Sequence, residues 1–113
     1  MTDRPAISHP LPDPLVELIA GRFRALGDPT RIRILDRLHD GEQTVGELTA
    51  AVGCTQQNVS KHLTLLLAAG IVTRRRAGNF SYYRIDDPTT LALCALVCEG
   101  LRNRAEALVS ASA

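Results

Sequence analysis

Helix start and stop signals constrain the fold of this chain more than any other feature of its sequence. Three Asp-Pro pairs each stand directly before a run of apolar residues at helical spacing: Asp13-Pro14, Asp28-Pro29 and Asp87-Pro88. Asp is a favourable N-cap, and Pro suits the first helical position because its missing N–H would have no partner there. Residues 44–47 read Thr-Val-Gly-Glu, the pattern of a capping box. With glycines as stop signals, these starts predict helices at residues 14–26, 29–40, 45–52, 56–69 and 88–109.

Residues 71–85 follow the pattern of two strands joined by a tight turn. The segments 71–76 and 80–85 are rich in β-branched, aromatic and arginine residues, and Ala77-Gly78-Asn79 connects them. Residues 1–12 contain three prolines and no periodicity, which predicts a flexible arm. Residues 13–109 are expected to form one domain that is mainly α with a β-hairpin, and residues 110–113 a tail.

The helices at 45–52 and 56–69 are joined by only Gly53-Cys54-Thr55, the short turn of a helix-turn-helix motif. On the second helix Val59, Leu63 and Leu66 recur at spacings of four and three residues, so we expect them to pack inward. The opposite face begins with polar side chains, and a recognition helix presents such residues to base edges in the major groove of DNA. With the hairpin that follows, the element order α-α-α-α-β-β-α is that of a winged helix-turn-helix.

The charge distribution singles out the same region. The net charge is only +1, but residues 54–85 hold five basic side chains and no acidic one, while both flanking segments are acidic. Strand alternation predicts Arg74 and Arg76 on one face of the hairpin and Arg75 on the other. The residues expected to contact DNA are Thr55, Gln56, Gln57, Asn58, Ser60, Lys61, His62, Arg74, Arg75, Arg76 and Asn79.

Two other classes of function were weighed against DNA binding. The sequence holds no Gly-rich phosphate loop, no His-Glu-x-x-His motif and no nucleophile elbow, so we do not expect an enzyme. The alternative is a winged-helix adaptor that binds protein. An adaptor would not need three arginines beside an uncharged, polar helix start, and its binding would lack the steep salt dependence of DNA binding.

Three stretches of the sequence resemble the ArsR/SmtB family of bacterial metalloregulatory repressors: residues 25–35 (Ala-Leu-Gly-Asp-Pro-Thr-Arg-Ile-Arg-Ile-Leu), 57–63 (Gln-Asn-Val-Ser-Lys-His-Leu) and 69–72 (Ala-Gly-Ile-Val). The resemblance covers residues 20–109. It implies a homodimer that reads palindromic operator DNA through two recognition helices, repression as the default, and an inducer that is often a metal ion. It also implies that base and phosphate contacts come from Gln56, Gln57, Ser60 and Lys61.

The familiar metal sites of that family are absent from this sequence. Where arsenic- and cadmium-type members carry Cys-x-Cys, residues 44–48 read Thr-Val-Gly-Glu-Leu. Of the zinc- and nickel-type ligands on the last helix only Asp87 remains, because the later positions are Gly100 and Asn103.

Other residues are candidates for sensing a signal. Cys94 and Cys98 share a helix face and can bind a soft metal ion, form a redox pair, or simply pack. His9 in the arm can help to bind a transition-metal ion such as nickel or zinc. Sensing by a partner protein is the further alternative.

The last helix is too apolar to be solvent-exposed on its own, which predicts a homodimer. The expected interface residues are Val16, Leu18, Ile19, Leu91, Cys94, Cys98 and Leu101. The chain shows no secretory signal and no apolar run long enough to span a membrane, and three cysteines fit a reducing compartment. We therefore expect a cytoplasmic protein without a membrane partner.

Overall fold

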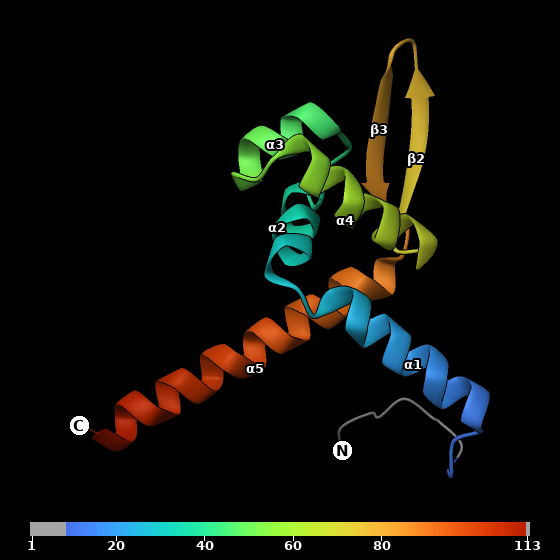
Figure 1. Cartoon of the computed structure of the whole chain (residues 1–113). Helices are drawn as coiled ribbons and strands as arrows, with labels where there is room; N and C mark the ends of the chain where they lie inside the picture. Colours follow the sequence, from blue (N-terminus) through green and yellow to red (C-terminus); the bar gives the residue numbers. More distant parts are fainter. Residues whose placement is uncertain (1–8, 113) are drawn as a thin grey trace.

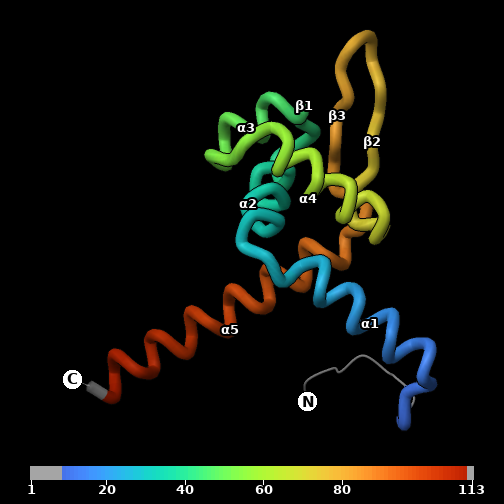
Figure 2. Tube along the Cα trace, viewed as in Figure 1, coloured from blue at the N-terminus to red at the C-terminus, as the bar shows by residue number. Residues whose placement is uncertain are grey.

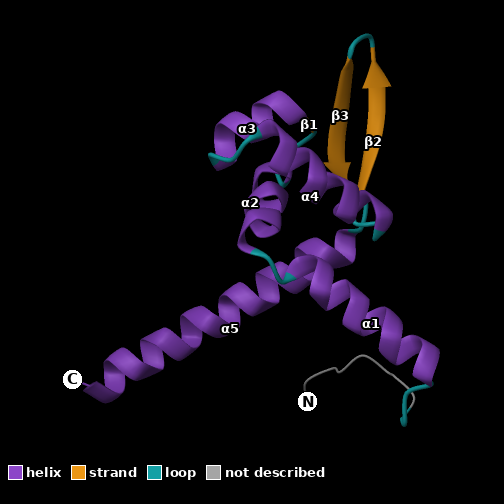
Figure 3. Ribbon diagram, viewed as in Figure 1, coloured by secondary structure: helices purple, strands orange, loops and turns teal. Residues whose placement is uncertain are grey.

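The computed structural model describes residues 9–112, in which helices pack beside the base of a small sheet (Figures 1 and 3). Its elements, in chain order, are α1 (Asp13–Leu26), α2 (Pro29–Leu38), β1 (Gln43–Thr44), α3 (Val45–Val52), α4 (Gln56–Ala68), β2 (Val72–Ala77), β3 (Phe80–Ile85) and α5 (Pro88–Ser112). The predicted fold, mainly α with a β-hairpin wing, is confirmed. Residues 1–8 of the predicted arm lie outside the described part of the chain.

Short-range capping bonds explain why most helices begin where the sequence predicts. The Asp28 carboxylate accepts the backbone N–H of Arg31 at 3.0 Å at the start of α2. Thr44 and Glu47 form the predicted capping box of α3, with bonds of 2.9 and 3.2 Å. The prediction for α1 was wrong in one respect: Pro12 is the N-cap, and Asp13 lies within the first turn and makes no capping bond.

Two helix ends differ from the prediction by more than one residue, and one strand was not predicted. Helix α2 ends at Leu38 rather than at residue 40, because His39 and Gly41 donate to carbonyls three residues back and tighten the last turn. Helix α5 continues to Ser112, so residues 110–112 are helical rather than a separate tail. No glycine or proline follows Gly100 to stop it. Strand β1 was not predicted, since two residues are too few to show an alternating pattern.

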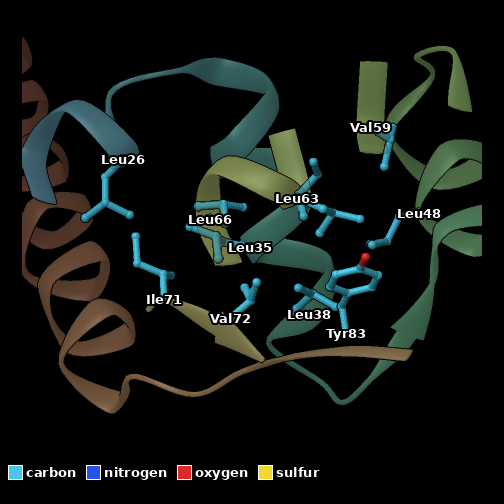
Figure 4. Close-up of a cluster of buried hydrophobic side chains, with 11 residues drawn as sticks. Leu26, Leu35, Leu38, Leu48, Val59, Leu63, Leu66, Ile71, Val72 and Tyr83 are labelled. Carbon is cyan, nitrogen blue, oxygen red and sulfur yellow. The ribbon is translucent and has the colours of Figure 1, made fainter. Parts of the chain in front are cut away.

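The core lies where α2, α3 and α4 meet the base of the wing (Figure 4). The predicted inward residues of α4, namely Val59, Leu63 and Leu66, are all fully buried, which confirms their assignment. They pack with Leu48 of α3 and with Val72 and Tyr83 of the wing. This packing fixes α4 against both α3 and the sheet.

The sheet has the order β1-β3-β2 and is antiparallel throughout. The β2–β3 hairpin projects beyond the helices, while α1 and the long α5 extend on the opposite side (Figures 1 and 2). In the part of the chain that the structure describes, no helix is both long and apolar enough to cross a membrane.

Candidate nucleic-acid interface

The turn between α3 and α4 sets the direction of the predicted recognition helix. Gly53 closes α3 in the left-handed conformation, at φ 72°, which glycine adopts without strain. The Thr55 hydroxyl then accepts the backbone N–H of Asn58 at 3.1 Å and starts α4. As a result, the polar residues at the N-terminal end of α4 lie on the surface.

Most of the predicted contact residues on α4 are exposed together. Gln56, Gln57, Ser60 and Lys61 are all solvent-exposed, as are their neighbours Thr55 and Asn58. A hollow at the start of the helix is lined by Gly53, Cys54, Thr55, Gln57, Asn58 and Lys61. The free N–H groups of a helix N-terminus and a nearby lysine favour an anion such as a phosphate.

His62 differs from the other predicted contact residues because its ring faces the interior. Its side chain is only 15% exposed, and its Nδ1 atom lies 3.2 Å from a guanidinium nitrogen of Arg31. The Asp28 carboxylate lies 3.9 Å from the same ring nitrogen. Arg31 lies in the first of the three family-like stretches, but no sequence pattern predicts its role, since nothing in the sequence shows that residues 31 and 62 meet.

The strand register divides the three wing arginines between two faces, as predicted. Directly paired residues share a face, and Arg74 pairs with Tyr83 while Arg76 pairs with Ser81. Because Val72 and Tyr83 on this face are buried in the core formed with α2, α3 and α4, Arg74 and Arg76 lie on the face of the wing that is turned toward these helices. Both arginines are exposed, as is Asn79 at the hairpin tip.

Arg75 lies on the other face and is already engaged within the protein. Its guanidinium lies over the ring of Tyr82, 4.7 Å from the centroid, and makes two hydrogen bonds to the carboxylate of Glu42. The hydrogen bond from Arg75 holds the pKa of Glu42 below its usual value. Glu42 and Tyr82 were not predicted as partners of Arg75, because they reach Arg75 only across the three-stranded sheet.

The predicted dimer residues are largely uncovered in the single chain. Val16, Ile19 and Leu18 on α1 are 43%, 36% and 71% exposed, and Leu101 on α5 is 64% exposed. Cys98 is also exposed, while Leu91 and Cys94 are half-buried. A cavity of about 400 Å³ between α1, α2 and α5 is lined by Phe23, Leu26, Gly27, Ile32, Leu93, Cys94, Val97, Cys98 and Leu101.

The candidate metal ligands do not gather into a site within one chain. Among the described residues there is no group of three or more His, Cys, Asp or Glu side chains that can hold a metal ion. Cys94 and Cys98 both line the cavity, and Arg102 lies 3.4 Å from the Cys98 sulfur. His9 is exposed, and Cys54 packs against the core.

Comparison with known proteins gives consistent matches. A helix-turn-helix domain profile matches residues 26–75. The chain is 42% identical over 78 residues to the HTH-type transcriptional regulator KmtR of Mycobacterium tuberculosis, an alignment that covers 69% of this chain and 60% of KmtR. It is 41% identical over 85 residues to the uncharacterized HTH-type transcriptional regulator Rv0081 of the same organism, covering 74% of this chain and 75% of that protein.

Solved structures agree in fold. The crystal structure of M. tuberculosis Rv0081 matches 87% of this chain and 99% of its own, with a TM-score of 0.79 and 37% identity. The homodimeric winged helix-turn-helix DNA-binding domain of Mb0332 from Mycobacterium bovis, a possible ArsR-family transcriptional regulator, matches 88% of this chain and 94% of its own, with a TM-score of 0.76 and 31% identity. The described elements therefore follow the architecture of winged helix-turn-helix regulators.

Proposed function

The chain belongs to the ArsR/SmtB family of DNA-binding winged helix-turn-helix regulators, and we propose that it acts as a homodimeric repressor at operator DNA. Its relatives are transcriptional regulators rather than enzymes. The observation that carries the proposal is the joint exposure of the α4 start and of Arg74 and Arg76, in a segment without a single acidic residue.

Each part of this surface has a distinct proposed role. Gln56 and Gln57 contact base edges in the major groove, where a glutamine amide can pair with adenine through two hydrogen bonds. Ser60 and Lys61 contact bases or neighbouring phosphates, and Thr55 and Asn58 line the hollow that receives a phosphate. Arg74, Arg76 and Asn79 of the wing grip the backbone or enter the adjacent minor groove. These assignments divide contacts that specify sequence from contacts that provide affinity.

The second copy is proposed to pack on α1 and α5. Large apolar side chains on these helices are exposed in the single chain, and burying them would stabilise the dimer by the hydrophobic effect. A two-fold dimer presents its two recognition helices to successive major grooves, roughly 34 Å apart. A palindromic operator is the sequence such a dimer would read.

The residues of one chain do not fit the metal ions bound by many members of the family. The two thiols of Cys94 and Cys98 supply fewer ligands than a four-coordinate zinc-type site needs, and no third ligand lies with them in the described residues. We propose instead that the signal acts on these two thiols in the cavity beside α1, either through a soft metal ion that accepts two thiolates or through oxidation. If neither a metal ion nor an oxidant acts on the thiols, a partner protein must sense the signal instead.

Fluorescence anisotropy of a labelled duplex from the protein's own promoter tests the proposal. The wild-type dimer should bind this duplex more tightly than a random one, and its affinity should fall steeply with salt because binding releases counterions. Nickel, zinc and an oxidant are then added in turn, with a Cys94→Ser, Cys98→Ser variant as the matched control. A shift seen in the wild type and lost in this variant supports sensing by the thiols. Absence of salt-sensitive DNA binding would overturn the proposed function.

A further inference from the structure

Arg31 lies where the end of α1, the start of α2 and the middle of α4 come together. Its Nε atom donates to the Ala25 carbonyl at 2.7 Å, and one terminal nitrogen donates to the Arg24 carbonyl at 3.2 Å. Both carbonyls belong to the last turn of α1, which ends at Leu26, so the guanidinium donates to acceptors at the negative end of that helix. One side chain of α2 thus fastens the C-terminal end of α1.

The third guanidinium nitrogen of Arg31 reaches α4. It lies 3.2 Å from Nδ1 of His62, and because a guanidinium can only donate, this ring nitrogen is the acceptor. His62 directly follows Lys61 and lies in the same turn as Ser60, two of the proposed DNA contacts. The bond therefore anchors the buried face of this turn of α4, and the exposed face of the same turn carries the proposed DNA contacts.

Asp28 completes this arrangement. Its carboxylate accepts the Arg31 backbone N–H at 3.0 Å, which caps the start of α2, and lies 3.9 Å from His62 Nδ1. The hydrogen bond from the backbone N–H of Arg31 lowers the pKa of Asp28 against desolvation, and the positive charge of the Arg31 guanidinium acts in the same direction. We call Asp28, Arg31 and His62 the Arg31 cluster.

We infer that Arg31 is a positioning residue that fixes the orientation of the recognition helix relative to α1 and transmits changes in α1 to DNA affinity. A guanidinium is planar, with donors in fixed directions, so it cannot follow a rotated α1 and also keep its bond to His62. Helix α1 carries proposed dimer residues, including Val16 and Ile19. The inference rests on the proposed operator binding and gives it a route of regulation.

The cavity beside α1 lies next to the connection that Arg31 makes between α1 and α4. Gly27 and Ile32, which stand directly before Asp28 and directly after Arg31 in the sequence, both line the cavity together with Cys94 and Cys98. A change at these thiols that moves the α1–α2 turn also moves the Arg24 and Ala25 carbonyls that Arg31 holds. The signal then reaches α4 through a single side chain, without any contact between the cavity and DNA.

The test compares four full-length variants with the wild type on the promoter duplex and on a random duplex of equal length. Arg31→Gln removes the guanidinium and its hydrogen bonds to the end of α1 and to His62. Arg33→Gln removes the same charge from an exposed position of the same helix and is the matched control. His62→Leu removes the acceptor while leaving the end of α1 capped, which keeps the test usable if Arg31→Gln folds poorly. The fourth variant combines Arg31→Gln with His62→Leu.

We expect Arg31→Gln and His62→Leu each to weaken promoter binding about tenfold, the range of a charge-assisted hydrogen bond, and to leave random-duplex binding within about twofold. Arg33→Gln should change neither affinity beyond about twofold, and the double variant should bind no worse than the weaker single variant. The inference is overturned if Arg31→Gln behaves like Arg33→Gln, if it weakens both duplexes equally, or if the two losses add. A wild-type protein that cannot distinguish the two duplexes would instead refute the proposed operator binding.

Discussion

The wing arginines offer a sharp test, because the structure separates three neighbouring residues of the same type into two roles. Arg74 and Arg76 are exposed on the face turned toward α4, whereas Arg75 is bound to Glu42 and stacked on Tyr82. We predict that Arg74→Gln and Arg76→Gln each reduce the salt dependence of operator binding. Arg75→Gln, which removes the same charge one position away, should leave it nearly unchanged.

The size of the effect follows from counterion release. Each phosphate neutralised contributes about 0.9 to the slope of log affinity against log salt concentration, and a dimer carries two wings. Arg74→Gln should therefore reduce the slope by about 1.8. Between about 50 and about 200 mM salt, the wild type should lose about tenfold more affinity than this variant.

Anisotropy titrations of the promoter duplex at several salt concentrations measure these slopes directly. A further variant, Glu42→Gln, should release Arg75 and make the slope steeper than that of the wild type. The interpretation of the wing would be refuted by an Arg75→Gln variant whose slope falls as much as that of Arg74→Gln. It would also be refuted if neither Arg74→Gln nor Arg76→Gln altered the slope.

Three further predictions concern stability and assembly. Leu63→Ala should lower the free energy of unfolding by about 2–5 kcal/mol in urea titrations, because Leu63 is fully buried between α4 and the core; a loss well under 1 kcal/mol would contradict that packing. The lowered pKa of Asp28 means that its ionised form stabilises the fold above about pH 4, and that this contribution is lost as the pH falls through the lowered value. Asp28→Asn keeps a capping oxygen but should flatten the dependence of the urea midpoint on pH in this range; an unchanged dependence would contradict the assignment. Leu101→Glu should convert a dimer into a monomer in sedimentation experiments at micromolar concentration, whereas Asn103→Glu, which adds the same charge to the same helix, should not; a wild-type monomer would defeat the dimer proposal.

Features of this fold that depend on residues close together in the chain were predictable from the sequence. Helix starts were predicted within a residue because they depend on contacts three residues apart, as at Asp28 with Arg31 and Thr44 with Glu47. Turn residues and apolar periodicity are also properties of short stretches of sequence. They predicted the helix-turn-helix, the hairpin and the buried face of α4. Asp13 shows the limit of this reasoning, because α1 begins one residue earlier than predicted, with Pro12 as its N-cap and Asp13 inside the first turn.

By itself the sequence determined which segment carries the positive charge and that Arg75 faces away from Arg74 and Arg76. Only the tertiary structure decided which of these charges stay free. The bond of Arg75 to Glu42 spans 33 residues, and that of Arg31 to His62 spans 31. Such pairs have no spacing that a sequence pattern can reveal, because the distance between their atoms is set by how the sheet and helices pack around the shared core. Local chemistry therefore fixed the elements of this protein, and packing assigned the roles of their side chains.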